Sequence, residues 1–212
     1  MLVMVRNDID KFLLSIPKGV TLVAATKYIN SDDMAVLYAH NIKNFGENRV
    51  DSFLKKYDEL KELKDVKWHF IGHLQRNKAK QVIDKIDYLH SLDSLDLAKM
   101  IDKYREKPLD TFIEVSINLE ENKNGVPYYE INSFLKEVLQ YKKINIVGLM
   151  MMAYKNSDEA YDEFIKLTNL RDKLEKEFNI KIPYLSMGMS DDYLEAIKAG
   201  ATHIRLGRIL YK

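Results

Sequence analysis

The sequence predicts a single (β/α)₈ barrel of the TIM type, with one extra helix ahead of the first strand. Three observations lead to this fold class. Short apolar, β-branched runs alternate with segments of helical periodicity along the chain of 212 residues, a pattern typical of βαβ units and a parallel sheet. The predicted strands number eight, which is the number that closes such a barrel. Polar and glycine-containing segments follow most of the strands, where barrels of this kind carry their sites.

The composition describes a soluble globular chain that can bury a full core, with 46% hydrophobic and 31% charged residues. The 33 basic and 32 acidic residues leave a net charge of +1, which argues against a protein-wide electrostatic footprint for nucleic acid or an anionic membrane. The absence of cysteine excludes disulfides, thiolate metal sites and cysteine nucleophiles, and it is compatible with the reducing cytoplasm. We therefore expect a cytoplasmic protein with neither a nucleic-acid nor a membrane partner.

We expect residues 1–212 to form one domain. No low-complexity segment and no linker rich in Pro, Gly or Ser marks a boundary within the chain. Arg6 and Asp8 interrupt the apolar start of the chain too early for a signal peptide. No uncharged run approaches the ~18 residues that a membrane span needs.

The first half of the chain supplies three strands and four helices. Apolar residues at helical spacing predict a helix over 2–14, which ends before Pro17. A continuous apolar run predicts the first strand over 20–26, because strands buried on both faces read in this way. Ser31 is expected to cap the helix that follows. The same alternation then predicts strands over 42–45 and 66–71, and helices over 31–41, 49–63 and 75–85.

The second half continues the alternation to the end of the chain. Pro108 stops one helix, Ser157 and Ser190 are expected to cap two others, and Gly200 is a C-terminal stop signal. The predicted strands cover 88–91, 111–117, 144–151, 184–187 and 202–206, and the predicted helices cover 94–105, 128–141, 157–178 and 190–199. A doubly wound open sheet is the alternative, but the chain has no Gly-x-Gly-x-x-Gly after a strand, which weakens its dinucleotide-binding version.

The first predicted strand ends on a lysine, Lys27. One interpretation is a solvated side chain whose charged head reaches water at the end of the strand. The other is a desolvated amine that can form a Schiff base with a carbonyl compound. The strand alone leaves both interpretations open.

The loops after the last two predicted strands have the composition of a phosphate site. Many such barrels bind a phosphate there, with backbone N–H groups and a helix N-terminus. Asp191 and Asp192 would repel a phosphate, and we interpret them instead as complementing the dipole of the helix. The phosphate is therefore expected toward Ser186, Gly207 and Arg208. The residues that favour such a site are glycines for close backbone approach (Gly188, Gly207), hydroxyl donors (Ser186, Ser190) and cations (Arg205, Arg208).

The histidines do not form a metal-binding pattern. His69 and His73 are four residues apart, but Gly72 breaks any helix that would place them on one face. The chain has no His-Glu-x-x-His, and the sequence therefore predicts no metal site. His90 and His203 lie within or beside predicted strands, and we interpret them as structural histidines.

A lysine that faces a phosphate site across a barrel mouth indicates a ligand with both an aldehyde and a phosphate. Pyridoxal 5′-phosphate is the natural candidate. Lys27 would form the Schiff base, the last two strands would hold the phosphate, and an arginine or another donor would lie near the ring nitrogen.

The sequence closely resembles the pyridoxal phosphate homeostasis protein family, which has the alanine racemase-like fold. The resemblance covers the chain from about residue 20 to its end. The stretches that carry it are Ala25-Thr26-Lys27, Phe45-Gly46-Glu47-Asn48, Trp68-His69-Phe70-Ile71-Gly72-His73-Leu74-Gln75-Arg76-Asn77-Lys78, Gly148-Leu149-Met150, Leu185-Ser186-Met187-Gly188-Met189-Ser190-Asp191-Asp192 and Arg205-Leu206-Gly207, together with Glu120-x-x-Lys123-x-Gly125.

This resemblance implies a barrel that binds pyridoxal phosphate through Lys27. Asn48 matches a position that faces the cofactor, and Arg205 matches the arginine on the ring-nitrogen side. The phosphate-binding stretches of the family include Ser186, Ser190, Gly207 and the residue at 208. Position 208 is a departure, because the family usually carries Thr or Ser there. Arg208 would either replace that hydroxyl with a charge-assisted contact or point away from the phosphate.

The resemblance implies a role in intracellular vitamin B6 homeostasis rather than catalysis, with the cofactor and apo forms of pyridoxal phosphate-dependent enzymes as partners and the protein as a monomer. The alternative is a racemase-like enzyme that acts on amino acids. A two-base racemase needs a second acid/base group, and the related alanine racemases take theirs from an additional C-terminal domain, which we do not expect here. The candidates for such a group here are Glu47, His73 and Tyr154. An aldolase-like barrel that uses Lys27 without a cofactor is a third possibility, and the family-like stretch over 185–192 argues against it.

Overall fold

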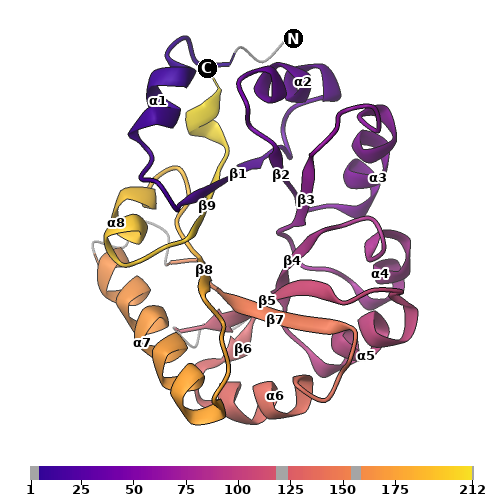
Figure 1. Ribbon diagram of the computed structural model, residues 1–212, viewed down its shortest axis with the longest axis vertical. Helices are drawn as coiled ribbons and strands as arrows, with labels where there is room; N and C mark the ends of the chain where they lie inside the picture. Colours follow the sequence, from indigo (N-terminus) through magenta and orange to yellow (C-terminus); the bar gives the residue numbers. More distant parts are fainter. Residues whose placement is uncertain (1–4, 118–123, 154–158, 212) are drawn as a thin grey trace.

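The computed structural model describes residues 5–117, 124–153 and 159–211, and in this part of the chain eight parallel strands close into a barrel. Figure 1 looks down the barrel and shows the helices as a ring around it. Each strand pairs with the next strand of the ring, and the last pairs with the first, from Thr21↔His203 to Ala24↔Leu206. The strands are β1 (Thr21–Ala25), β2 (Asn44–Glu47), β3 (Lys67–Phe70), β4 (Tyr88–Leu92), β5 (Leu109–Ser116), β7 (Ile144–Met150), β8 (Tyr184–Ser186) and β9 (His203–Leu206). The predicted fold class is confirmed.

One further strand was not predicted. The two-residue β6 (Val126–Pro127) pairs with the C-terminal end of β5, where Val115 lies opposite Val126. Two residues are too few to show the alternation by which strands are recognised in a sequence. This strand and the 3₁₀ turn η1 (Tyr128–Glu130) precede α6, so that helix begins later than predicted.

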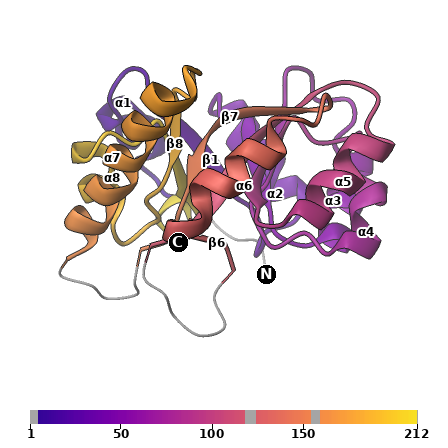
Figure 2. The ribbon, with the colours of Figure 1, turned by 90° about the horizontal axis from the view of Figure 1, so that it is seen from below.

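Helices cover the outside of the ring, and Figure 2 shows α7 and α8 along one flank and α3, α4 and α5 along the other. The helices that follow strands are α2 (Ser31–Ala39), α3 (Val50–Glu59), α4 (Arg76–Val82), α5 (Leu95–Tyr104), α6 (Ile131–Val138), α7 (Ala160–Phe178) and α8 (Tyr193–Lys198). No helix in the described part of the chain is both long and apolar enough to cross a membrane.

The predicted N-terminal helix, α1 (Ile9–Ser15), occupies the eighth place in the helical ring. The last strand is followed only by a 3₁₀ turn, η2 (Arg208–Leu210). Phe12 of α1 packs against Tyr193 of α8, with ring centroids 6.1 Å apart. On the other side, Asp10 Oδ1 lies 2.8 Å from His40 Nδ1 at the end of α2. The extra helix therefore fills the space between α8 and α2.

The cap of α2 differs from the prediction. Asn30 is the capping residue rather than Ser31, because Asn30 Oδ1 accepts from the Asp33 N–H at 2.8 Å. The Asp33 carboxylate accepts in return from the Asn30 N–H, which completes a capping box. Ser157, another predicted cap, lies outside the described residues, and α7 begins at Ala160.

The apolar core fills the layer between the strands and the helices. Trp68 of β3, for example, meets Phe53 of α3 edge-on, with ring centroids 5.3 Å apart. The interior of the barrel is different, since three histidines are buried there, on β3 (His69), β4 (His90) and β9 (His203). The barrel therefore has an apolar outer layer and a partly polar centre.

Candidate functional site

The predicted site lies at the C-terminal ends of four neighbouring strands. Lys27 is the second residue after β1 and Asn48 is the first after β2, and these two strands are adjacent. Arg205 is in β9, which pairs with β1, and Ser186 ends β8, which pairs with β9. The strand order β2-β1-β9-β8 therefore gathers residues from both ends of the sequence on one sector of the barrel mouth. Gly207 directly follows β9 in the same sector.

Lys27 is exposed in the turn that follows β1. Its ammonium lies 4.8 Å from the centroid of the Tyr28 ring, within the range of a cation–π contact. The structure shows a solvated amine rather than one desolvated by burial, and a Schiff base on Lys27 therefore requires an exposed amine to react. The amine is accessible to a ligand at the barrel mouth.

A buried ion pair supports the turn that carries Lys27. Lys56 of α3 is 7% exposed, and its ammonium donates to Glu47 Oε1 at 2.6 Å and to the Thr26 carbonyl at 2.7 Å. The Glu47 carboxylate also accepts from the hydroxyls of Thr26 and Ser52. Since Thr26 directly precedes Lys27, these bonds fix the peptide from which the Lys27 side chain extends.

The same contacts change the interpretation of the acid/base candidates. Glu47 points outward to α3, where Lys56 neutralises it, so it does not face the barrel mouth. His73 follows β3, and its Nδ1 lies 2.9 Å from the Asp93 carboxylate. Tyr154 lies outside the described residues, as do Glu120 and Lys123 of the family-like stretch.

Asn48 carries a buried acceptor without a partner. Its Oδ1 is the one buried side-chain oxygen or nitrogen without a hydrogen bond in the described part of the chain. Gly72 lies directly against it, because a Cβ at Gly72 would stand 2.5 Å from the Asn48 carbonyl oxygen and 2.7 Å from the Asn48 Cβ. An unsatisfied buried acceptor is costly, so this atom fits a place where a ligand donates a hydrogen bond.

The loop after β9 presents two backbone donors to one hydroxyl. Ser190 Oγ accepts from the N–H of Gly207 at 3.3 Å and from the N–H of Ile209 at 3.4 Å. Ser190 is therefore not the helix cap that the sequence predicts, and Asp192 holds the N-cap position of α8. Clustered backbone N–H groups beside a hydroxyl form the kind of concavity that binds phosphate.

Arg208 points away from this cluster. Its guanidinium pairs with Asp191, and the two side chains are 73% and 77% exposed. Of the two alternatives for this position, the structure shows the arginine at the rim, with its charge balanced by the carboxylate. The dipole interpretation of Asp191 is replaced by this ion pair, and Asp192 accepts from the Met189 N–H.

Arg205 lies inside the barrel, close to the mouth. It donates to Ser186 Oγ at 2.6 Å and to the Met151 carbonyl at 2.9 Å. Burial lowers the pKa of Arg205 to about 10, and the nearby carboxyls of Glu114 and Asp192 oppose that shift. The guanidinium therefore keeps its charge at neutral pH.

Glu114 of β5 is a candidate functional residue that was not predicted from the sequence. This carboxyl is 4% exposed, and burial raises its pKa to about 7, with a further increase from Asp93 and opposing effects from Arg205 and His73. In the sequence it stands inside a β-branched run and looks like an ordinary strand residue. Its position in the strand could have indicated it. Glu114 is two residues after Phe112, which packs against His90 in the interior, so both side chains point to the same face of β5.

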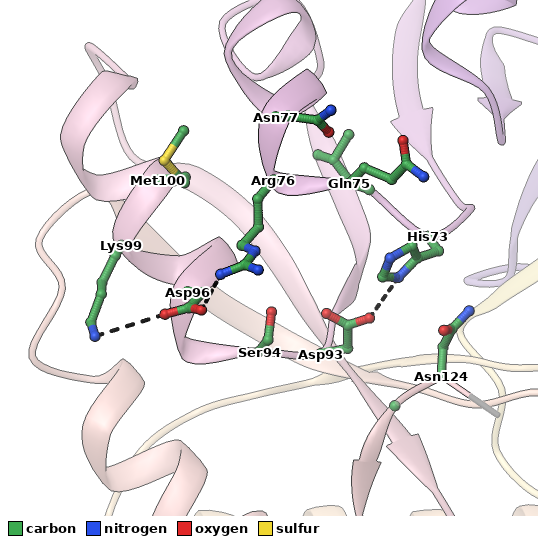
Figure 3. Close-up of a pocket in the computed structure, with 12 residues that line it drawn as sticks. His73, Gln75, Arg76, Asn77, Asp93, Ser94, Asp96, Lys99, Met100 and Asn124 are labelled. Carbon is green, nitrogen blue, oxygen red and sulfur yellow. Dashed lines mark hydrogen bonds and ion pairs between the residues drawn. The ribbon is translucent and has the colours of Figure 1, made fainter. Parts of the chain in front are cut away.

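A separate cavity of about 1140 Å³ lies beside the mouth, between the loops that follow β3 and β4. Figure 3 shows that its charged side chains face one another, with His73 paired to Asp93 and Arg76 paired to Asp96. None of the predicted cofactor-binding residues lines it. The charged side chains that line the cavity pair with one another, so we assign the cavity no ligand. No group of three or more metal-ligating side chains occurs among residues 5–117, 124–153 and 159–211.

The comparisons with known sequences agree with one another. A family model described as alanine racemase, N-terminal domain, matches residues 13–212. The pyridoxal phosphate homeostasis protein of Aquifex aeolicus is 40% identical over 195 residues, which cover 90% of this chain and 85% of that protein. The protein of the same name from Schizosaccharomyces pombe is 34% identical over 203 residues, covering 92% of this chain and 84% of that protein.

Solved structures show the same relationship. PipY of Synechococcus elongatus, solved without PLP, has a TM-score of 0.89 and 30% identity, and the match covers 95% of this chain and 97% of PipY. PipY with PLP bound has a TM-score of 0.86 and 28% identity, covering 96% and 100% of the two chains. Alanine racemase of Corynebacterium glutamicum has a TM-score of 0.74 at 15% identity, over 99% of this chain and 61% of that enzyme, which is a likeness of fold alone.

Proposed function

The chain belongs to the pyridoxal phosphate homeostasis protein family, and on this premise we propose that it holds pyridoxal 5′-phosphate as a Schiff base on Lys27, in cofactor homeostasis rather than catalysis. One observation carries the proposal. An exposed amine, an unpartnered acceptor on Asn48 and the guanidinium of Arg205 lie at the ends of three consecutive strands of the barrel. These groups match the aldehyde, the polar ring substituents and the ring nitrogen of that cofactor.

Each residue has a defined part in binding. Pyridoxal phosphate supplies an aldehyde, and the Lys27 amine condenses with it to form a C=N bond and release one water. Asn48 Oδ1 accepts a hydrogen bond from the bound ligand, and Arg205 donates toward the ring nitrogen. Gly207 contributes its N–H to the phosphate, together with the N–H of Ile209.

Three residues of the proposed cofactor set act in other ways. Ser190 Oγ accepts from the two N–H groups, and where a phosphate takes over as their acceptor the serine would turn its own hydrogen toward the phosphate. Ser186 reaches the cofactor through Arg205, because its oxygen already accepts from that guanidinium. Arg208 adds a positive charge at the rim, at the expense of its ion pair with Asp191.

Schiff-base formation is tested by absorbance titration and borohydride reduction. Wild type should develop a visible band with pyridoxal phosphate and gain one reduced adduct by intact mass, and Lys27→Ala should show neither. Lys78→Ala is the matched control, because Lys78 of α4 is engaged with Asp51 at 3.6 Å and should not carry the cofactor. A band that persists in Lys27→Ala, or one that is lost in Lys78→Ala, would refute the assignment.

The contact between Gly72 and Asn48 gives a second prediction. Gly72→Ala should weaken cofactor binding by about tenfold or more, because the new methyl group displaces Asn48 and its buried acceptor. Gly19→Ala is the control, since Gly19 precedes β1 at the opposite end of the barrel and has open space around it. Its positive φ of 92° makes alanine strained there, so it should cost stability without changing affinity. Equal affinities of the two variants would contradict the role of Asn48.

Glu114 supports the alternative function, a racemase-like enzyme dependent on pyridoxal phosphate. A buried carboxyl with a pKa of about 7 near the mouth is suited to proton transfer at neutral pH. Amino-acid racemisation by the cofactor-loaded protein should stay at background if the carrier role is correct. Robust turnover that is abolished in both Lys27→Ala and Glu114→Gln would establish the enzyme instead.

A carrier role also defines the partners. We propose that the protein acts in the cytoplasm as a monomer and passes its cofactor to apo forms of pyridoxal phosphate-dependent enzymes. Incubation of the loaded protein with such an apoenzyme should restore the activity of that enzyme faster than cofactor release into buffer allows. Equal rates would show that no direct transfer occurs.

A further inference from the structure

A chain of hydrogen bonds runs through the barrel interior and ends on Arg205. It begins at Asn44 on β2, crosses β3, β4 and β8, and reaches Arg205 on β9. Its members and distances are Asn44 Oδ1 to His69 Nε2 (3.1 Å), His69 Nδ1 to His90 Nε2 (2.9 Å), His90 Nδ1 to Ser186 Oγ (2.8 Å) and Ser186 Oγ to Arg205 Nη1 (2.6 Å). The chain therefore joins the N-terminal end of one strand to the proposed cofactor site.

The two ends of the chain, a guanidinium that only donates and the amide oxygen of Asn44 that only accepts, fix the direction of its bonds. A guanidinium can only donate, so Ser186 Oγ accepts from it and turns its own hydrogen to His90 Nδ1. His90 then carries its proton on Nε2 and donates to His69. The reverse direction would leave the serine hydrogen without an acceptor in this chain.

The direction continues to the far end. His69 accepts at Nδ1, so its proton is on Nε2, which faces the acceptor Oδ1 of Asn44. Both histidines are therefore neutral, each with one donor and one acceptor. Protonation of either would place two donors against each other and break the chain.

The surroundings keep the two histidines neutral. Both are fully buried, and burial lowers their pKa values well below the ordinary 6.5, with further contributions from neighbouring cations and histidines. His69 stacks on Tyr88 and His90 stacks on Phe112, with ring centroids 4.6 and 4.3 Å apart. The stacked rings hold each imidazole in the orientation that its hydrogen bonds need.

We propose that His69 and His90 are positioning residues that fix Ser186 and, through it, aim the Arg205 guanidinium at the ring nitrogen of the cofactor. This role rests on the proposed function. Arg205 uses one N–H for Ser186 and one for the Met151 carbonyl, which leaves three of its five N–H groups for other acceptors. Because both terminal nitrogens of the guanidinium are anchored, its plane is fixed and its remaining donors have a set direction.

The chain predicts a loss of affinity that depends on the ring nitrogen. His90→Phe keeps an aromatic ring against Phe112 but leaves the Ser186 hydrogen without its acceptor. It should weaken binding of pyridoxal phosphate by about tenfold, the size of one well-placed hydrogen bond to a charged group. Binding of the deaza analogue, which has carbon in place of the ring nitrogen, should change by less than about threefold.

Two further variants separate positioning from packing. His203→Phe is the matched control, because His203 is buried in the same interior and bonds to Thr202 instead of the chain. It should leave the affinities for both ligands unchanged. His90→Asn restores an acceptor for Ser186 and should recover part of the lost affinity. If His90→Phe fails to fold, Ser186→Ala breaks the chain with a smaller change in volume and should show the same dependence on ligand.

The outcomes distinguish a failure of the proposed function from a failure of the positioning role. A wild-type protein that gives no visible band with pyridoxal phosphate would refute the proposed function itself. A wild type that binds, with His90→Phe and His203→Phe equal in affinity, would refute the positioning role alone. Equal losses for pyridoxal phosphate and its deaza analogue would also refute it, because general damage to the pocket does not depend on the ring nitrogen.

Discussion

Lys56→Met should lower the free energy of unfolding by about 3 to 5 kcal/mol, the usual cost of breaking a buried ion pair on one side. The substitution leaves the Glu47 carboxylate fully buried with only hydroxyl donors, and it removes the donor to the Thr26 carbonyl. Urea unfolding of wild type and variant at neutral pH measures the difference. Methionine fills much of the space of lysine, so the loss of stability comes mainly from the missing charge rather than from a cavity.

The neighbouring lysine is a matched control. Lys55 is 75% exposed and pairs with Glu59 at the surface, so Lys55→Met should change stability by less than about 1 kcal/mol. The double variant Glu47→Gln with Lys56→Met removes both charges and should recover part of the loss. Equal stabilities of Lys55→Met and Lys56→Met would show that the buried pair does not support the β1–α2 turn.

Acidification should destabilise the fold steeply below about pH 6.5, the ordinary pKa of histidine. In the folded protein, burial lowers the pKa of His203 to about 4 and those of His69 and His90 well below 6.5. The unfolded chain therefore binds more protons than the folded chain, and stability falls as pH falls. Each histidine contributes about 1.4 kcal/mol per pH unit in this window.

Glu114 opposes this trend. Its pKa is raised to about 7 in the folded state, so the folded chain gains that proton first, and stability rises as pH falls from about 7 toward the ordinary value near 4.5. Three histidines act against this carboxyl and that of Asp192, whose pKa burial also raises, so the net effect of acidification below about pH 6.5 is a loss of stability. Urea unfolding at a series of pH values measures this slope.

A histidine variant isolates the cause of that slope. His203→Met removes one titrating group from the interior, and its stability should decline less steeply with acidification, by about 1.4 kcal/mol per pH unit. His40→Gln is the control, because His40 is only partly buried and pairs with Asp10 at the surface. A pH slope that is unchanged in His203→Met would contradict the neutral, buried state of this histidine.

The barrel could be predicted from the sequence because its strands are buried on both faces. The runs at 20–26 and 144–151 are apolar almost throughout, and segments with helical periodicity follow them. The strands β1 and β7 lie within these two runs. The caps could not be predicted as well. Asn30 and Ser31 are both good capping residues, and the choice depends on the reciprocal bond to Asp33.

Lys27 and Gly207 could be predicted because they lie close after strands, whereas Asn48 was predicted from the family resemblance. The remaining features depend on side chains that meet only in the folded barrel. His90 and Ser186 are 96 residues apart, and no local pattern indicates that they share a hydrogen bond. His90 looked like a structural histidine in the sequence, and its satisfied hydrogen bonds agree with that interpretation, but its connection to Arg205 required the structure.

The central claim is that the cofactor is held on Lys27, and peptide mapping tests it most directly. The purified protein is loaded with pyridoxal phosphate, reduced with borohydride, digested and sequenced by tandem mass spectrometry. We predict one modified residue, Lys27, at a stoichiometry that approaches one per chain. Modification centred on another lysine, or spread over exposed lysines with none on Lys27, would contradict the account.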